Sequence, residues 1–369
     1  MTTTPLTEDL IRTLPKVSLH DHLDGGLRPQ TILELAHEQG IDLPGGAPMD
    51  DAEALGAWFA AQADSGSLVE YLTTFDVTLS VMQSAAGLER IAREFVADLV
   101  LDGVVYGEIR WAPEQHCERG LSLEQAVEAV QAGLDYAVAA AAESGNTIRV
   151  GQLITAMRHN NQGMEIAKLA LAYRDRGCVG FDIAGAEAGF PPSRFADAFT
   201  FLAENMFPVT VHAGEADGVE SIRSALVDGR TLRLGHGVRI AEDIDNLTAG
   251  EAETAGLGTV ARWVLERGIP LELSPSSNLQ TGAVEQWGNE IAQHPFNDLY
   301  RLGFAVTVNT DNRLMSSTSL TKELSLLVTA FGYGLEDLLL FQLNAVGGAF
   351  LPFAEREELV DQLVSAYTA

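Results

Sequence analysis

Apolar and polar positions along the chain follow two alternating patterns. Short runs rich in Val, Ile and Leu predict buried strands, and longer stretches with apolar residues at helical spacing separate them. The eight predicted strands are residues 16–20, 104–110, 148–154, 179–183, 209–212, 233–235, 271–273 and 305–309. The helical stretches between them are residues 123–143, 162–175, 194–204, 218–228, 260–266 and 297–302. Repeated strand–helix alternation predicts an α/β fold, specifically a parallel (β/α)₈ TIM barrel.

Two helix-rich segments lie outside this alternation. Between the first and second strands, about residues 50–100, helical patterns cover residues 52–63, 68–84 and 87–101. An insertion in this βα loop is expected to lie over the carboxyl-end mouth of the barrel, where lids are found. C-terminal helices are expected at about 318–368. No repeat or linker divides the chain, so we predict a single domain over residues 1–369.

Composition narrows the classes of partner. The chain has 23 Lys and Arg against 52 Asp and Glu, a formal charge of −29, and 46% hydrophobic residues. This charge repels nucleic-acid backbones and anionic membranes and favours neutral or cationic small molecules, although acidity also serves solubility. The N-terminus lacks a basic segment followed by an apolar run, and no apolar stretch approaches the ~18 residues of a membrane span. We therefore expect a cytoplasmic enzyme that binds neither nucleic-acid polymers nor membranes; the oligomeric state is not indicated.

Histidines and an aspartate gather at predicted strand ends. His20 and His22 close the first strand on one face, His212 closes the fifth, and Asp311 follows the eighth. Carboxyl ends of barrel strands meet at one mouth, so these side chains are expected to converge there. Three imidazoles and a carboxylate suit a divalent transition metal, zinc first, with a position open for water. The only cysteines, Cys117 and Cys178, argue against a disulfide framework or a thiolate zinc site.

Two further residues fall near the same mouth. Glu215 follows the fifth strand and reads equally as a general acid held protonated near an apolar pocket or as a first-turn helix acid. His236, between two glycines, is either a fifth ligand or a base that orients water, with a buried structural histidine as the plain alternative. Of the other histidines, His37 and His294 are predicted to be surface residues. His116 and His159 follow the second and third strands and could line the mouth.

Four motifs resemble those of one family. They are residues 15–25 (PKVSLHDHLDG), 211–215 (VHAGE), 234–237 (LGHG) and 309–311 (NTD), with residues 71–76 (YLTTFD) in the insertion. Together, and in this order, they resemble the adenosine deaminase family along essentially the whole chain. The resemblance implies a zinc-dependent (β/α)₈ barrel that hydrolyses adenosine or 2′-deoxyadenosine to the inosine counterpart and ammonia, in purine salvage.

The resemblance also implies residue roles. One zinc ion per chain would be bound by His20, His22, His212 and Asp311. For catalysis, Glu215 would protonate purine N1, His236 would orient the attacking water, and Asp311 would assist the proton movements.

Substrate contacts follow from the same resemblance. Asp24 would accept from the ribose 5′-hydroxyl, His22 would lie beside the sugar, and the Gly185 amide would donate to purine N3. Many members have two successive aspartates where this chain has Asp311 and Asn312. An amide donates to the N7 acceptor without an unusual protonation state, so Asn312 is a compatible replacement. The loop at residues 186–189 (AEAG) also departs from the acidic pair that is commoner there.

Two other functions remain open on sequence grounds. One is a sister deaminase acting on adenine, adenylate or a modified purine nucleoside. Asp24 argues against a 5′-phosphate, because two anions in a poorly screened pocket repel. The other is a catalytically silent barrel used for binding, which would be expected to lack a metal ligand or Glu215. The deaminases of nucleic-acid bases use His/Cys/Cys ligands and a paired-cysteine motif, which this chain lacks.

Overall fold

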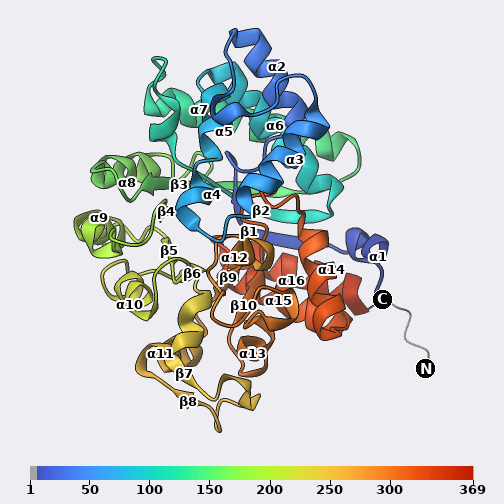
Figure 1. Cartoon of the computed structure of the whole chain (residues 1–369), viewed down its shortest axis with the longest axis vertical. Coiled ribbons are helices and arrows are strands. Elements are labelled where there is room, and N and C mark those ends of the chain that lie inside the picture. The colour runs from blue at the N-terminus through green and yellow to red at the C-terminus, as the bar shows by residue number, and fades with distance from the viewer. Residues whose placement is uncertain (1–5, 369) are drawn as a thin grey trace.

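Eight parallel strands form the centre of the molecule. The structure, a computed structural model, describes residues 6–368. Hydrogen bonds give the strand orders β1-β2-β3-β4 and β10-β9-β6-β5, and two parallel bridges, Asp21 to Asp311 and Phe181 to Val209, join these sheets into a closed barrel (Figure 1). The predicted (β/α)₈ barrel is confirmed. The strands are β1 (Lys16–His22), β2 (Val104–Trp111), β3 (Arg149–Met157), β4 (Cys178–Ala184), β5 (Thr210–Ala213), β6 (Arg233–His236), β9 (Leu271–Leu273) and β10 (Val306–Val308).

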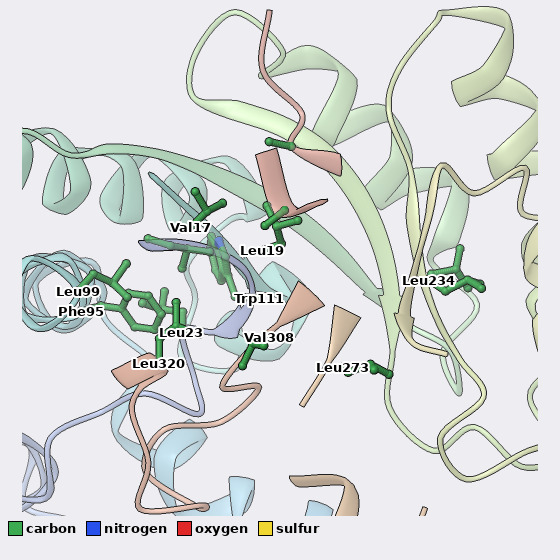
Figure 2. Close-up of a cluster of buried hydrophobic side chains, with 14 of the residues drawn as sticks. Val17, Leu19, Leu23, Phe95, Leu99, Trp111, Leu234, Leu273, Val308 and Leu320 are labelled. Carbon is green, nitrogen blue, oxygen red and sulfur yellow. The ribbon is translucent and has the colours of Figure 1, made fainter. Parts of the chain in front are cut away.

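Helices cover the outside of the barrel. Their apolar faces pack on the strands, so the strands are buried on both sides and read as nearly continuous apolar runs. Figure 2 shows one part of this core, where Leu23, in the turn after β1, meets Phe95 and Leu99 of α6 (Ala85–Leu101) and Leu320 of α14 (Leu320–Phe331). The covering helices are α6 (Ala85–Leu101), α7 (Leu123–Glu143), α8 (Gly163–Ala172), α9 (Ala196–Glu204), α10 (Val219–Val227), α11 (Thr259–Arg267) and α13 (Phe296–Arg301).

The C-terminal helices appear as predicted. They are α14 (Leu320–Phe331), α15 (Leu335–Gly348) and α16 (Phe353–Thr368), and α15 packs against β1 and β10. Among residues 6–368, none of the helices combines the length and apolar character needed to cross a bilayer.

The insertion differs from its prediction in one element. Residues 52–63 form α3 (Ala52–Ala63) as expected, but the single helix predicted over 68–84 is two helices, α4 (Leu68–Leu72) and α5 (Phe75–Val81). The break falls at Thr73 and Thr74, whose hydroxyls donate to backbone carbonyls three residues earlier and so compete with the helix. α6, the last helical stretch, packs along α7 and β2 on the outer ring.

The sequence patterns missed several short elements. These are α1 (Glu8–Thr13), α2 (Pro29–Gln39), α12 (Pro275–Gln280) and the antiparallel pair β7 (Ile244–Asp245) and β8 (Gly256–Leu257). Two of the missed helices carried a readable start signal, because α2 and α12 both begin with proline at the first helical position.

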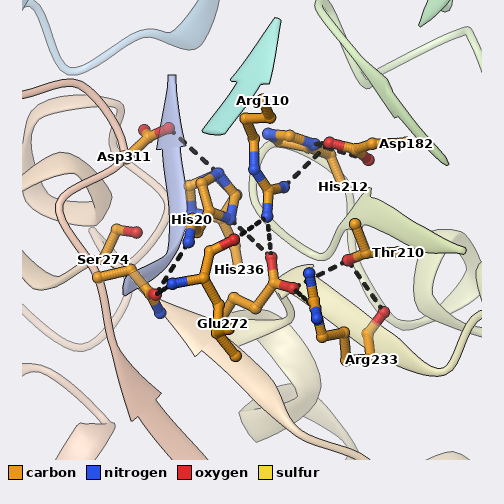
Figure 3. Close-up of polar contacts among 12 residues, drawn as sticks. His20, Arg110, Asp182, Thr210, His212, Arg233, His236, Glu272, Ser274 and Asp311 are labelled. Carbon is orange, nitrogen blue, oxygen red and sulfur yellow. Dashed lines mark hydrogen bonds and ion pairs between the residues drawn. The ribbon is translucent and has the colours of Figure 1, made fainter. Parts of the chain in front are cut away.

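A network of charges fills the barrel interior beneath its mouth (Figure 3). Glu272 of β9 accepts from Arg110 of β2 at 2.7 Å and also from Arg233 of β6. Arg110 bonds in addition to Asp182 of β4 at 2.9 Å, and Arg233 to Glu108 of β2. All five side chains are fully buried. Since each charge is matched by hydrogen-bonded partners from other strands, the network holds four of the eight strands in register.

Replacing Glu272 by glutamine should therefore destabilise the fold strongly. The change leaves two buried guanidinium groups without their shared anion, for which we expect a loss of about 3–5 kcal/mol in the free energy of unfolding. Denaturant unfolding measures this loss. The matched control is Glu358→Gln, which removes an exposed ion pair with Arg149 and should cost less than about 1 kcal/mol. Equal losses in the two variants would contradict the assigned importance of the network.

Candidate metal centre and active site

Three imidazoles and one carboxylate converge at the carboxyl ends of the strands. His20 and His22 come from β1, His212 from β5, and Asp311 from the turn after β10. His22 Nε2 lies 3.2 Å from His212 Nε2, and Asp311 Oδ1 lies 3.2 Å from His20 Nε2 and 3.3 Å from His22 Nε2. The four candidate ligand atoms all lie within 4.8 Å of one another. The structure thus brings together the four residues that the strand-end pattern predicted as ligands.

Hydrogen bonds on the outer side of the cluster orient its imidazoles. His20 Nδ1–H donates to Glu272 Oε2 at 2.9 Å, and His212 Nδ1–H donates to Asp182 Oδ2 at 2.9 Å. Each bond holds Nδ1 against a carboxylate and directs Nε2 at the centre of the cluster, where Asp311 Oδ1 lies 3.2 Å from the Nε2 of His20. Carboxylate–imidazole pairs of this kind support metal-bound histidines.

The fourth member of the cluster is oriented in the same manner. Ser277 Oγ donates to Asp311 Oδ2 at 2.6 Å, which leaves Oδ1 directed at the imidazoles.

Burial holds the pKa of His22 well below its usual range, so that ring is neutral, as a metal ligand must be. The donor set therefore fits a divalent transition metal.

Two residues at this mouth adopt a backbone conformation that side chains rarely allow. His236 and Asp311 both have φ of 58°, in the left-handed region. Such a conformation costs on the order of 1–3 kcal/mol and persists only where its surroundings enforce it. β6 can approach β5 closely here because Gly235 has no side chain. A Cβ at this position would lie only 3.0 Å from the His212 Cα.

Glu215 is buried beside the cluster. Its Oε2 lies 3.5 Å from His236 Nε2, and its Oε1 has no hydrogen-bond partner among the described residues. Burial, reinforced by the negative charges of Asp311 and Glu187, raises the pKa of Glu215 well above its ordinary value. The carboxyl group is therefore poised to be protonated and to donate a proton or a hydrogen bond.

The loop that carries Glu215 is wrapped around another carboxylate. Glu187, in the loop after β4, accepts from four successive backbone N–H groups, those of residues 214–217, at 2.7–3.0 Å. The Ser221 hydroxyl donates to it as well. A carboxylate that accepts several backbone N–H groups holds their loop rigidly, so Glu187 fixes the position of Glu215.

A cavity of about 280 Å³ opens next to the cluster of candidate metal ligands. His22, Asp24 and Gly185 line it, and α4 and α5 contribute Leu72 and Phe75. Burial raises the pKa of Asp24 to about 7, and its Oδ1 has no hydrogen-bond partner among residues 6–368. None of the described residues that line this cavity is lysine or arginine.

Asn312 is buried and is not one of the described residues that line the cavity. It is 3% exposed, and a Cβ on Gly25 would fall 1.9 Å from its Oδ1, so glycine is required at position 25. The Asn312 Oδ1 has no hydrogen-bond partner among the described residues.

The remaining histidines divide between the cavity and the core. His159 is at the cavity wall and His37 is exposed. His116 is buried, with Nδ1 3.1 Å from the Met82 carbonyl oxygen. The prediction of a surface position for His294 was wrong: it is 2% exposed, because residues 291–296 fold against α12 and place its ring 3.4 Å from Asn278.

Sequence reasoning missed the residues that support the cluster. Two of them carried a signal, because Asp182 and Glu272 are acidic residues inside apolar strands and such charges are rarely buried without partners. Ser277, Asn278 and Glu187 gave no such signal, since their partners lie far along the chain.

A parallel (β/α)₈ barrel with three histidines and an aspartate at its carboxyl-end mouth defines a metal-dependent hydrolase. The chain matches the adenosine deaminase family over residues 15–366 and belongs to that family. It is 53% identical to adenosine deaminase 1 of Streptomyces coelicolor over 356 residues, 96% of this chain and 87% of that protein. It is also 53% identical to the adenosine deaminase of Mycolicibacterium gilvum over 362 residues, 98% of this chain and 97% of that protein.

Among solved structures, an arabidopsis N6-mAMP deaminase is similar to the chain. The two share 28% identity with a TM-score of 0.80, over 97% of this chain and 100% of that one.

Proposed function

We propose that the protein is a zinc-dependent adenosine deaminase, which hydrolyses adenosine and 2′-deoxyadenosine to inosine and 2′-deoxyinosine with release of ammonia. The observation that carries this proposal is the buried Glu215, whose raised pKa favours the protonated carboxyl group, beside three imidazoles that could bind a metal. A neutral carboxyl group next to a hydrolytic centre is what protonation of a purine ring nitrogen requires. The family and its relatives of about half-identical sequence support the same activity.

His20, His22, His212 and Asp311 would hold one zinc ion per chain. When bound, zinc lowers the pKa of water and so provides a nucleophile near neutral pH. Glu215 holds a proton toward purine N1, which makes C6 electrophilic. His236, whose Nε2 lies 3.5 Å from Glu215, orients the attacking water, and Asp311 takes part in the proton movements.

The cavity supports an uncharged sugar rather than a phosphate. Asp24 presents an unpartnered, buried oxygen that accepts from a ribose 5′-hydroxyl, with His22 beside the sugar. A 5′-phosphate would place a second anion next to Asp24, and no lysine or arginine among the described lining residues would compensate it. This cavity therefore favours nucleosides over nucleotides such as the N6-mAMP for which the arabidopsis neighbour is named.

Two residues would recognise the base. The Gly185 amide donates to N3 from the cavity wall, and the Asn312 amide nitrogen donates to N7, which is an acceptor. α4 and α5 supply Leu72 and Phe75 over the same space and would act as a lid within one domain of residues 1–369.

A substrate panel tests the proposal. Purified protein should contain about one zinc ion per chain and should deaminate adenosine and 2′-deoxyadenosine, followed by the change in purine absorbance. A chelator should abolish turnover and added zinc should restore it. Adenine, adenylate and N6-methyladenosine are the comparison substrates, and faster turnover of any of them would contradict the assignment.

Glu215→Gln should keep the fold and the metal but lose about 10²–10⁴-fold in kcat, because an amide N–H is not acidic enough to transfer a proton to N1. Steady-state kinetics and metal analysis measure the two effects. Glu220→Gln is the matched control, since Glu220 is exposed on α10, and it should behave as the parent enzyme. A turnover rate near that of the parent for Glu215→Gln would refute the acid role.

Asp24→Ala should reduce kcat/KM for adenosine by about 10–100-fold, the effect of losing one charge-assisted hydrogen bond. The loss should be small for 5′-deoxyadenosine, which has no 5′-hydroxyl to donate. Measuring both substrates on both proteins isolates the contact. Equal losses on the two nucleosides would show that Asp24 does not bind the 5′-hydroxyl.

A further inference from the structure

A row of buried polar groups leads away from His236. Its Nδ1 lies 2.9 Å from Asn278 Nδ2, and Asn278 Oδ1 lies 3.4 Å from His294 Nε2. Asn278 belongs to α12 and His294 precedes α13, so neither is on a barrel strand. Their exposed fractions are 0% and 2%. Buried polar groups in contact must agree on which atom donates and which accepts.

The direction of this row is set by the backbone. The amide N–H of Phe296 donates to His294 Nδ1 at 3.0 Å, so that nitrogen is an acceptor and the ring carries its proton on Nε2. His294 Nε2–H then donates to Asn278 Oδ1. The Ser274 backbone N–H also donates to that oxygen at 3.4 Å. Two donors, one of them a main-chain group, thus fix which end of the Asn278 amide is oxygen.

The other end of the amide fixes His236. An amide nitrogen only donates, so His236 Nδ1 must accept from Asn278 Nδ2. The hydrogen of the imidazole is therefore on Nε2, the nitrogen that faces Glu215. A metal-bound imidazole needs a free lone pair on its coordinating nitrogen. His236 is built as a hydrogen-bond donor to the reacting centre and not as a fifth ligand.

We propose that Asn278 and His294 are positioning residues that hold His236 in the Nε2–H tautomer, so that its ring donates to the attacking oxygen. The proposal rests on the proposed deaminase function. It has a second consequence for the metal. Glu215, His236 and Asp311 form another group with closely spaced ligand atoms, but this tautomer withholds the imidazole lone pair that a second ion would need. The hydrogen-bonded row from His294 through Asn278 to His236, called the relay below, thus keeps the centre at one ion per chain.

Nitrogen NMR of the protein labelled with ¹⁵N-histidine tests the tautomer directly. The signals of His236 are identified by their absence in His236→Gln. We expect Nδ1 of His236 to resonate as an unprotonated, hydrogen-bonded nitrogen and Nε2 as a protonated one. The opposite pattern overturns the proposal. This readout does not depend on turnover, so it separates failure of the relay from failure of the deaminase assignment.

Asn278→Asp tests the relay by reversal. A carboxylate accepts from Nδ1–H and therefore favours the other tautomer, which leaves Nε2 without a hydrogen. We expect kcat to fall by about 10²–10⁴-fold while KM changes by less than about threefold, with metal content kept. The NMR pattern of His236 should reverse. Unchanged kcat with an unchanged tautomer overturns the role of Asn278.

A pair of variants at His294 separates positioning from packing. His294→Gln keeps an N–H donor near the Nε2 position, whereas His294→Phe keeps an aromatic ring and has no donor. If His294 acts through the relay, the glutamine variant should retain at least about tenfold more activity than the phenylalanine variant. Both should contain the metal. Activity of the phenylalanine variant equal to or above that of the glutamine variant overturns the role of His294.

Discussion

The carboxylate of Glu272 is the interaction on which the rest of the structure depends. One of its oxygens accepts from Thr210 and Arg233, and the other from Arg110 and from the imidazole of His20. Burial alone would raise the pKa of Glu272, but Arg110 and Arg233 hold it well below its ordinary value. The same charge that balances the barrel interior therefore orients a candidate metal ligand, so the register of the strands and the geometry of the site are one constraint.

The strained part of the site depends on a different element, α12. His236 and Asp311 are both held in the left-handed backbone region, and each receives a hydrogen bond from this short helix. Ser277 donates to Asp311, and the next residue, Asn278, donates to His236. Consecutive residues of one helix thus support both strained positions. Rigid support from outside the barrel strands is what lets these side chains keep orientations that a free loop would lose.

The amino-acid sequence is sufficient to predict the barrel and the ligand quartet, because both follow from local patterns and one topological rule. Strand periodicity is local, and parallel strands in a barrel end at one mouth, so the pattern alone places His20, His212 and Asp311 together. The supporting contacts do not follow in this way. Glu187 binds a loop 27 residues further along the chain, and His294 contacts Asn278 across 16 residues. Both contacts involve irregular segments, where the periodicity of apolar residues does not indicate which way a side chain points. For that reason the predicted surface position of His294 is wrong.

The distribution of cations inside the barrel bears on which purines the site accepts. Arg110 and Arg233 are fully buried, but they lie in the barrel interior beneath the imidazole cluster, where they are paired with carboxylates. The cavity beside His22 contains Asp24 and, among its described lining residues, no lysine or arginine. A phosphate entering that cavity would exchange full hydration for a neighbouring carboxylate. Under the proposed function, selection for uncharged nucleosides therefore follows from Asp24 and from the lack of lysine or arginine among the described residues that line the cavity.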